Sequence, residues 1–196
     1  MKALDEAEFT IVGTGLMGAS LALALRGKVK ALHGVDTNPE AREAAASCFD
    51  AVAAEFDPQA RPDVIILATP VRAILQWLRA LPAQIAPGTL ILDLGSSKRE
   101  IVALMDALPD SLLAVGGHPM CGKESSGPGE AESSLFIGRP FVLCRTAHTT
   151  TEAWDFATQI VAALDAQLVN LDAEQHDQAV AAISHLPYLV SSGLVA

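Results

Sequence analysis

Short apolar runs alternate with segments of helical character along most of this chain. Apolar runs of four to six residues predict strands that are buried on both faces of a sheet. The predicted strands are residues 9–12, 32–35, 51–54, 63–68, 89–93, 112–116, 141–144 and 166–171. The predicted helices between them are residues 19–25, 38–48, 71–81, 99–108 and 151–164. Regular alternation predicts an α/β fold with a doubly wound, mostly parallel sheet and right-handed crossovers.

Two segments depart from this alternation. Residues 117–138 form the longest stretch without clear periodicity, and a loop of this length inside a compact domain is usually functional or disordered. From Asp172 the chain is rich in helix formers through Ala196, and Pro187 is expected to kink that helix. We therefore expect an α/β domain over residues 1–171. Residues 172–196 are expected to be the first helix or helices of an incomplete α-helical domain.

A glycine turn joins the first predicted strand to the first predicted helix. Gly13, Gly15 and Gly18 form a G-x-G-x-x-G motif, and Asp36 closes the second strand. Gly13 permits the tight turn, Gly15 lets the backbone approach a pyrophosphate, and Gly18 lets the helix pack on the strand. Together with the strand, the helix and the spaced acid, this motif predicts a Rossmann-type dinucleotide-binding domain.

The same stretch predicts which dinucleotide binds. Leu16 and Met17 belong to the glycine turn directly before the predicted helix and are expected to bind the cofactor, because the free N–H groups and the positive dipole end of a helix start favour phosphate. The carboxylate of Asp36 suits a free ribose 2′-hydroxyl and repels a 2′-phosphate, so that NAD is favoured over NADP. Thr37, Asn38 and Arg42 nearby leave some tolerance for NADP.

Polar residues follow other strands at the carboxyl edge of the sheet, where doubly wound folds bind ligands. Thr69 and Pro70 are expected to line the cofactor, or they only end a strand. His118 can act as a base on a substrate hydroxyl during hydride transfer, or it bonds only a backbone carbonyl. Ser96 can bond the same hydroxyl or orient His118, or it caps the next helix. Glu124 can serve the substrate or only solvate its loop.

The histidines of the last helical stretch and the cations near the sheet edge are weaker candidates for a role in the chemistry. His176 and His185 lie nine residues apart on the last helical stretch, which spreads them over different faces and does not indicate a metal pair. We expect His176 to be an ordinary polar helix residue, whereas His185, just before Pro187, can point into a cleft. The cations near the sheet edge are expected mostly at the surface, and they are Lys98, Lys123, Arg139 and Arg145.

Composition excludes several kinds of binding partner and indicates the cellular compartment. The net charge of −10 argues against nucleic acid and anionic membranes as partners. The three cysteines have no spacing of a metal site, a redox pair or a disulfide framework, so no metal is expected. No apolar run reaches the length of a membrane span, and residues 1–6 are not a signal peptide. We therefore expect a cytoplasmic enzyme with a small-molecule substrate.

Several motifs occur together along nearly the whole chain. They are residues 13–21, 68–71, 93–98, 117–127, 135–140, 176–177 and 184–187. In this order they resemble the prephenate/arogenate dehydrogenase family of tyrosine biosynthesis. The loop that carries His118, together with the Ser-His-Leu-Pro run at 184–187, is far more specific than the glycine motif.

The resemblance implies an NAD(P)-dependent oxidative decarboxylation of a cyclohexadienol. Prephenate would give 4-hydroxyphenylpyruvate, and arogenate would give tyrosine. By resemblance, His118 matches the catalytic histidine that bonds the ring hydroxyl, and Ser96 matches a serine that supports this hydroxyl and the nicotinamide. Glu124 matches an acidic residue at the pocket mouth, and His185 matches a histidine near the substrate side chain. A homodimer is also implied.

Two departures from the family keep other interpretations open. Tyr188 stands where the family usually has a second histidine, which bears on substrate selectivity and on feedback by tyrosine. Family members also continue into a helical domain that supplies dimer contacts and an arginine for the substrate carboxylate. One alternative is an NAD-binding module without turnover. Another is a different hydroxyacid-type dehydrogenase, but those commonly place a catalytic lysine after the cofactor domain, and no lysine follows Lys123. The sequence does not separate prephenate from arogenate.

Overall fold

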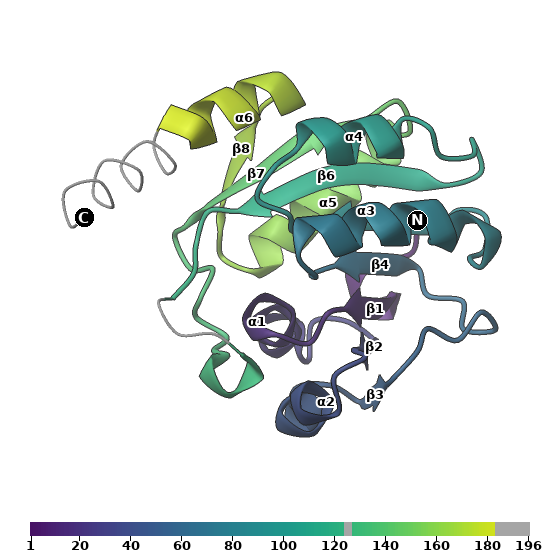
Figure 1. Ribbon diagram of the computed structural model, residues 1–196, viewed down its shortest axis with the longest axis vertical. Helices are drawn as coiled ribbons and strands as arrows, with labels where there is room; N and C mark the ends of the chain where they lie inside the picture. Colours follow the sequence, from purple (N-terminus) through teal and green to yellow (C-terminus); the bar gives the residue numbers. More distant parts are fainter. Residues whose placement is uncertain (124–126, 183–196) are drawn as a thin grey trace.

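The computed structural model describes residues 1–123 and 127–182, and these fold around an eight-stranded sheet (Figure 1). Its strand order is β3-β2-β1-β4-β5-β6-β7-β8. The strands are β1 (Glu8–Val12), β2 (Ala31–Val35), β3 (Ala51–Ala53), β4 (Val64–Leu67), β5 (Leu90–Asp93), β6 (Leu113–Pro119), β7 (Pro140–Arg145) and β8 (Gln167–Asn170). The order changes direction between β1 and β4, which is the switch point of a doubly wound fold. The predicted fold class is confirmed.

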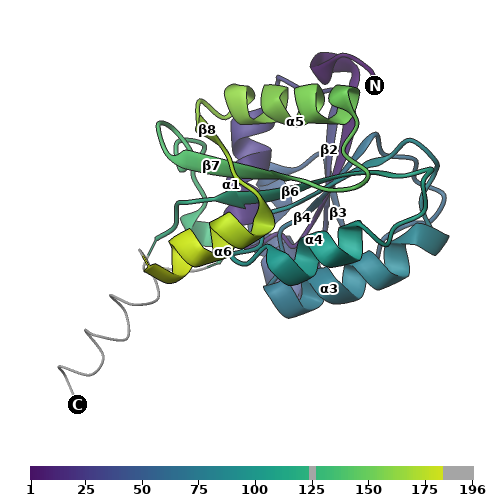
Figure 2. The same cartoon turned by 90° about the horizontal axis from the view of Figure 1, so that it is seen from above.

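Helices cover both faces of this sheet. Helices α1 and α5 pack on one face, and α3 and α4 pack on the other (Figure 2). The helices are α1 (Leu16–Leu25), α2 (Pro39–Ala45), α3 (Val71–Ala80), α4 (Arg99–Met105), α5 (Thr151–Ala163) and α6 (Ala173–Val180). Short 3₁₀ turns lie at Leu4–Glu6, Ala46–Cys48, Leu81–Ala83 and Pro128–Glu130. None of the helices in the described part of the chain has the length and apolar character to cross a membrane.

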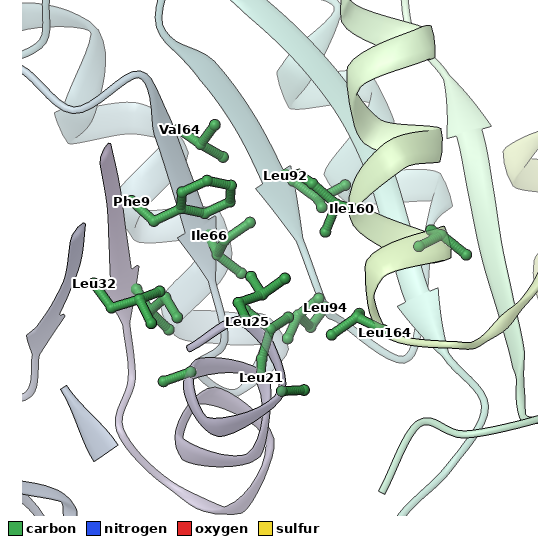
Figure 3. Packing of buried hydrophobic residues seen from close by; sticks show 14 of the residues in the cluster. Phe9, Leu21, Leu25, Leu32, Val64, Ile66, Leu92, Leu94, Ile160 and Leu164 are labelled. Atoms are coloured by element: carbon green, nitrogen blue, oxygen red, sulfur yellow. The ribbon is translucent and has the colours of Figure 1, made fainter. Parts of the chain in front are cut away.

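The core is divided in two because successive side chains of a strand point to opposite faces. On one face Phe9 of β1 and Ile66 of β4 pack with Leu21 of α1 and Ile160 of α5 (Figure 3). On the other face Ile65 of β4 packs with α3 and α4. All five side chains are fully buried, and each burial stabilises the fold by about 1.5–3 kcal/mol. Burial on both faces explains why the central strands are continuous apolar runs.

Strands β7 and β8 run opposite to the other six strands, because β7 pairs antiparallel with β6 and β8 pairs parallel with β7. A parallel connection needs a long crossover, usually a helix. The described residues between β6 and β7 contain only the 3₁₀ turn Pro128–Glu130, so the chain returns directly. The pairing also extends β6 to Pro119, three residues beyond the predicted strand end, since Pro119 pairs with Phe141. His118 consequently lies on a paired strand end and not in a free loop.

Helix α6 begins where the sequence predicts. The side chain of Asp172 accepts a hydrogen bond from the amide of Gln175, and the Gln175 side chain accepts one from the amide of Asp172, which completes a capping box. The helix packs beside α4 and the end of the sheet (Figure 2). Residues 183–196, including Pro187, lie outside the described residues. The assignment of residues 172–196 to a second domain stays a prediction.

Candidate active site

A cleft of about 420 Å³ opens at the carboxyl ends of β1, β2 and β4. It lies at the switch point of the sheet, where open α/β folds bind their ligands. Five of the predicted cofactor residues line it, and they are Gly13, Gly15, Asp36, Thr69 and Pro70. The other lining residues are Val12, Val35, Thr37, Ala68, Ala73, Gln76 and Trp77. The structure thus brings together residues that lie up to 65 positions apart, from Val12 to Trp77.

Close backbone contacts require two of the three glycines in the turn. Gly13 has a φ of +95°, and a Cβ there would lie 2.8 Å from the backbone of Ala68. A Cβ on Gly18 would lie 1.9 Å from the carbonyl oxygen of Gly13. Gly15 is different, because a Cβ there would meet nothing within 4 Å. Gly13 and Gly18 therefore hold α1 against the sheet, while Gly15 borders open space in the cleft.

The start of α1 fits the phosphates of a dinucleotide. Gly15 is the N-cap and supplies no side-chain hydrogen bond to the first turn, so the helix start can offer N–H groups to an anion. The side chains of Leu16 and Met17 pack against the core, so these residues would act through their backbone. In the same cleft, the buried Oγ1 of Thr69 has no hydrogen-bond partner within the described residues. A buried polar atom of this kind suits a bound ligand.

The carboxylate of Asp36 is fixed at the end of β2. Its Oδ2 accepts hydrogen bonds from the amide and the hydroxyl of Thr14, at 2.9 and 3.2 Å, and its Oδ1 accepts one from the amide of Asn38 at 2.9 Å. A carboxylate has about four acceptor sites, so one is left for a ribose hydroxyl. Arg42 lies beside it, since Nη1 donates to the carbonyl oxygens of Asp36 and Thr37 at 2.8 and 2.9 Å.

His118, near the end of β6, is joined to α6 by a chain of hydrogen bonds. Its Nδ1 lies 2.8 Å from Nε2 of His176, and Nδ1 of His176 lies 2.8 Å from Oδ1 of Asp177. The two imidazoles meet edge to face, with their centroids 5.0 Å apart. His176 is fully buried and His118 is half-buried. The partner of His118 is therefore a histidine side chain, so the alternative of a bond to a backbone carbonyl alone is wrong.

Lys98 is a buried charge and is the exception to the expectation that the nearby cations lie mostly at the surface. Its ammonium has no exposed area and forms an ion pair with the equally buried Asp93. It also donates to the carbonyl oxygen of Gly117 at 2.6 Å. Asp93 accepts further hydrogen bonds from the amides of Gly95 and Gly117, at 2.8 and 3.0 Å. This ion pair fastens the end of β5 to β6 directly before His118.

The surroundings of His118 keep its imidazole neutral at physiological pH. The pKa of His118 is lowered from 6.5 to about 3. Burial of the ring is the largest cause, the Lys98 ammonium and His176 add to it, and Asp177 opposes the shift. A neutral imidazole has a free lone pair and can accept a proton from a hydroxyl. The electrostatics of the site therefore suit the expected role of His118 as a base.

The lowered pKa of His118 predicts a loss of stability in mild acid. Between pH 3 and pH 6.5 the unfolded state binds a proton at His118 and the folded state does not, so the free energy of unfolding rises with pH. When the pH is lowered from about 7.5 to about 5, the protonation of His118 in the unfolded state should reduce the free energy of unfolding by about 2 kcal/mol. Urea unfolding at both pH values measures the loss.

The matched variants for this measurement are His118→Asn and His33→Asn. We expect His118→Asn to lose about 2 kcal/mol less than the parent over this pH range. His33 is exposed on β2, so its variant should follow the parent curve. An equal loss in the parent and in His118→Asn would contradict a depressed pKa at His118.

Ser96 is exposed on the loop between β5 and α4. The alternative that it caps the following helix is wrong, because the N-cap is Lys98. The amides of Lys98 and Arg99 donate instead to the carboxylate of Asp177, at 2.7 and 3.0 Å. The carboxylate of Asp177 therefore holds the start of α4 as well as the ring of His176. The expected contact of Ser96 with a substrate hydroxyl stays a prediction.

Two predicted substrate residues, Glu124 and His185, lie outside the described residues, as does Tyr188. The expectation that His176 is an ordinary polar helix residue is wrong, since the structure buries it completely against His118. One sequence signal was available for it. His176 and Val180 lie four positions apart, on the face of α6 that is buried.

Comparisons with known proteins agree with a nucleotide-binding role for this fold. The family model described as "Prephenate dehydrogenase, nucleotide-binding domain" matches residues 20–170. The prephenate dehydrogenase of Bacillus subtilis (strain 168) is 33% identical over 192 residues, which cover 94% of this chain and 52% of that protein. The chain therefore spans about half the length of this relative.

Crystal structures of similar proteins share the architecture. The prephenate dehydrogenase of Aquifex aeolicus in complex with hydroxyphenyl propionate and NAD⁺ has a TM-score of 0.89 and 27% identity, over 99% of this chain and 70% of that one. Synechocystis arogenate dehydrogenase has a TM-score of 0.84 and 31% identity, over 96% and 68% of the two chains. Because the family model covers more than half of its length, the chain belongs to the prephenate dehydrogenase family and contains the nucleotide-binding domain of that family.

Proposed function

We propose that this chain binds NAD in the cleft at the switch point and takes part in the oxidative decarboxylation of prephenate or arogenate. The observation that carries the proposal is the position of a neutral, half-buried His118 at the carboxyl edge of a sheet whose switch point holds a dinucleotide cleft. The same edge therefore supplies a place for the cofactor and a base for the substrate.

The chain's own residues account for binding of the cofactor. The N–H groups at the start of α1 would hold the pyrophosphate, and the carboxylate of Asp36 would accept a hydrogen bond from the adenosine ribose. Oγ1 of Thr69, which has no hydrogen-bond partner among residues 1–123 and 127–182, would gain one from the cofactor. When bound, NAD supplies an acceptor for the hydride that leaves the carbinol carbon of the substrate.

His118 would handle the proton of the ring hydroxyl. Its Nδ1 is engaged by His176, which leaves Nε2 for the substrate. This nitrogen accepts the hydroxyl proton as the carbon loses hydride and the carbon–oxygen double bond forms. The ring carbon opposite then loses CO₂, and the electron pair of the broken bond makes the ring aromatic. The phenolate oxygen takes the proton back, so His118 is neutral again at the end of the reaction.

Formation of reduced nicotinamide, followed by its absorbance, tests this function. The chain is mixed with NAD and saturating prephenate, and separately with NAD and arogenate. Turnover with either substrate, and none when substrate is omitted, is the expected result. Binding of NAD without turnover on either substrate would contradict the catalytic proposal and favour the alternative of an NAD-binding module. Comparison of the two rates also decides between prephenate and arogenate.

Asp36 and Arg42 predict how the cofactor preference can be changed. In Asp36→Ser, the lost charged acceptor should weaken NAD binding roughly 10- to 100-fold, since such a hydrogen bond contributes about 1.5–3 kcal/mol. NADP binding should improve, because the repulsion of the 2′-phosphate is gone and the Arg42 guanidinium lies beside the same position. Calorimetric titration with both nucleotides measures the change. Adding Arg42→Gln should remove the gain for NADP, and a persistent gain would contradict the role given to Arg42.

Gly15 and Gly18 form a matched pair that separates binding from folding. Gly15→Ala meets open space and should keep the stability of the parent, but its methyl group would obstruct the pyrophosphate and weaken NAD binding roughly tenfold. Gly18→Ala would place a methyl group against the carbonyl of Gly13 and should destabilise the fold by about 3 kcal/mol. Thermal unfolding and NAD titration measure both effects. Equal loss of stability in the two variants would contradict the claim that a methyl group at Gly15 meets open space.

A further inference from the structure

We propose that His176 and Asp177 are positioning residues that hold His118 in the tautomer with a proton on Nδ1 and a free lone pair on Nε2. This inference deepens the proposed function, because it states which nitrogen of His118 is ready to take the hydroxyl proton. The assignment of the tautomer is a property of the free protein and can be measured without cofactor or substrate.

The carboxylate of Asp177 starts the argument because it can only accept hydrogen bonds when ionised. Its Oδ1 accepts from the amide of Lys98 at 2.7 Å, and its Oδ2 accepts from the amide of Arg99 at 3.0 Å. Both amides have a fixed direction at the start of α4, so they fix the orientation of the carboxylate. The Nδ1 of His176 lies 2.8 Å from Oδ1 and must therefore carry the proton of that bond.

The proton on Nδ1 of His176 determines the rest of the chain. A neutral imidazole has one N–H and one lone pair, so Nε2 of His176 is an acceptor. The atom 2.8 Å from it is Nδ1 of His118, which must then be the donor. Nε2 of His118 is consequently the nitrogen with the lone pair. The side chain of His176 has no exposed area, so solvent water does not compete with its Nε2 as the acceptor for Nδ1 of His118.

Charge near the pair supports this neutral arrangement. The buried Lys98 ammonium disfavours a second positive charge on His118. The hydrogen-bond acceptors of the Lys98 ammonium are Asp93 and the carbonyl oxygen of Gly117, and no hydrogen bond joins it to His118 within the described part of the chain. Among the described residues, the hydrogen-bond partner of the His118 ring is His176.

The direct test is the ¹⁵N spectrum of the histidine rings in the whole chain at about pH 8, where an ordinary histidine is neutral. Long-range correlation of ring protons with ring nitrogens distinguishes a protonated nitrogen from one with a lone pair. We expect a protonated Nδ1 and an unprotonated Nε2 in both His118 and His176. A proton on Nε2 of His118, or protons on both nitrogens of His176, would overturn the proposal.

Two variants of His176 test what the tautomer does for catalysis. His176→Leu removes the acceptor, so His118 should populate both tautomers, and kcat should fall roughly 10- to 100-fold with little change in KM. His176→Gln keeps an oxygen that can accept from Nδ1 of His118 and should recover most of kcat and the single tautomer. If kcat of His176→Leu were as high as kcat of His176→Gln, His176 would only fill space. If the parent has no turnover, the proposed function fails while the ¹⁵N spectrum still decides on the tautomer.

Discussion

Replacement of His118 by asparagine is expected to lower kcat roughly 10²- to 10⁴-fold, because the substrate hydroxyl loses its proton acceptor. Asparagine has a similar size and can still accept a hydrogen bond, but it cannot take up a proton at neutral pH. Binding of NAD should be unchanged, since His118 is not among the residues that line the dinucleotide cleft. Steady-state rates of reduced nicotinamide formation, combined with NAD titration, separate the two effects.

The control for this prediction is His33→Asn, which changes an exposed histidine on β2 and should keep the parent kcat. The His118 variant should also retain the unfolding temperature of the parent at neutral pH within a few degrees. A kcat within about threefold of the parent, well below the range for a lost acid–base group, would contradict the assignment of His118 as the base.

Replacement of Lys98 by methionine is expected to lower the free energy of unfolding by about 3–5 kcal/mol, which is the cost of breaking a buried ion pair from one side. Asp93 would keep its hydrogen bonds from the amides of Gly95 and Gly117, but its charge would have no cation beside it. Methionine has a similar length, so little packing volume is lost. Urea unfolding at neutral pH measures the difference.

Two further variants identify the cause of that loss. Lys98→Met combined with Asp93→Asn removes both charges and should recover part of the lost stability, since the asparagine side chain can still accept from one of the two backbone amides. Lys30→Met breaks an exposed ion pair with Glu8 and should leave the unfolding curve close to that of the parent. If the double variant is less stable than Lys98→Met alone, the buried charge is not the source of the loss.

The sequence predicts most of the fold because the strands and helices are local patterns. Residues 64–67 are apolar on both faces, and this run is buried on both faces of the sheet. Thr150 and Asp172 are the N-caps of α5 and α6, and both are residue types that favour this position. The antiparallel direction of β7 could not be read from the apolar run alone, because direction depends on the connection and not on the strand.

The candidate site was predicted less completely, and for a physical reason. The residues of the glycine turn and Asp36 are close in sequence, so a motif reveals them. The burial of Lys98 could not be predicted, because it depends on a partner at Asp93 and on the carbonyl of Gly117, which a later strand brings into place. His176 lies 58 positions from His118, and only the packing of α6 beside α4 unites them.

The central claim is that the cleft and the His118 ring belong to one NAD-dependent site, and an NMR titration of the chain with NAD tests it most directly. The titration follows the amides of Gly13, Gly15 and Asp36 together with the ring of His118. We predict that all four respond and saturate at the same NAD concentration, because the nicotinamide end reaches the edge that carries His118. A response confined to one of the two places, or no saturable response in the glycine turn, would contradict the claim.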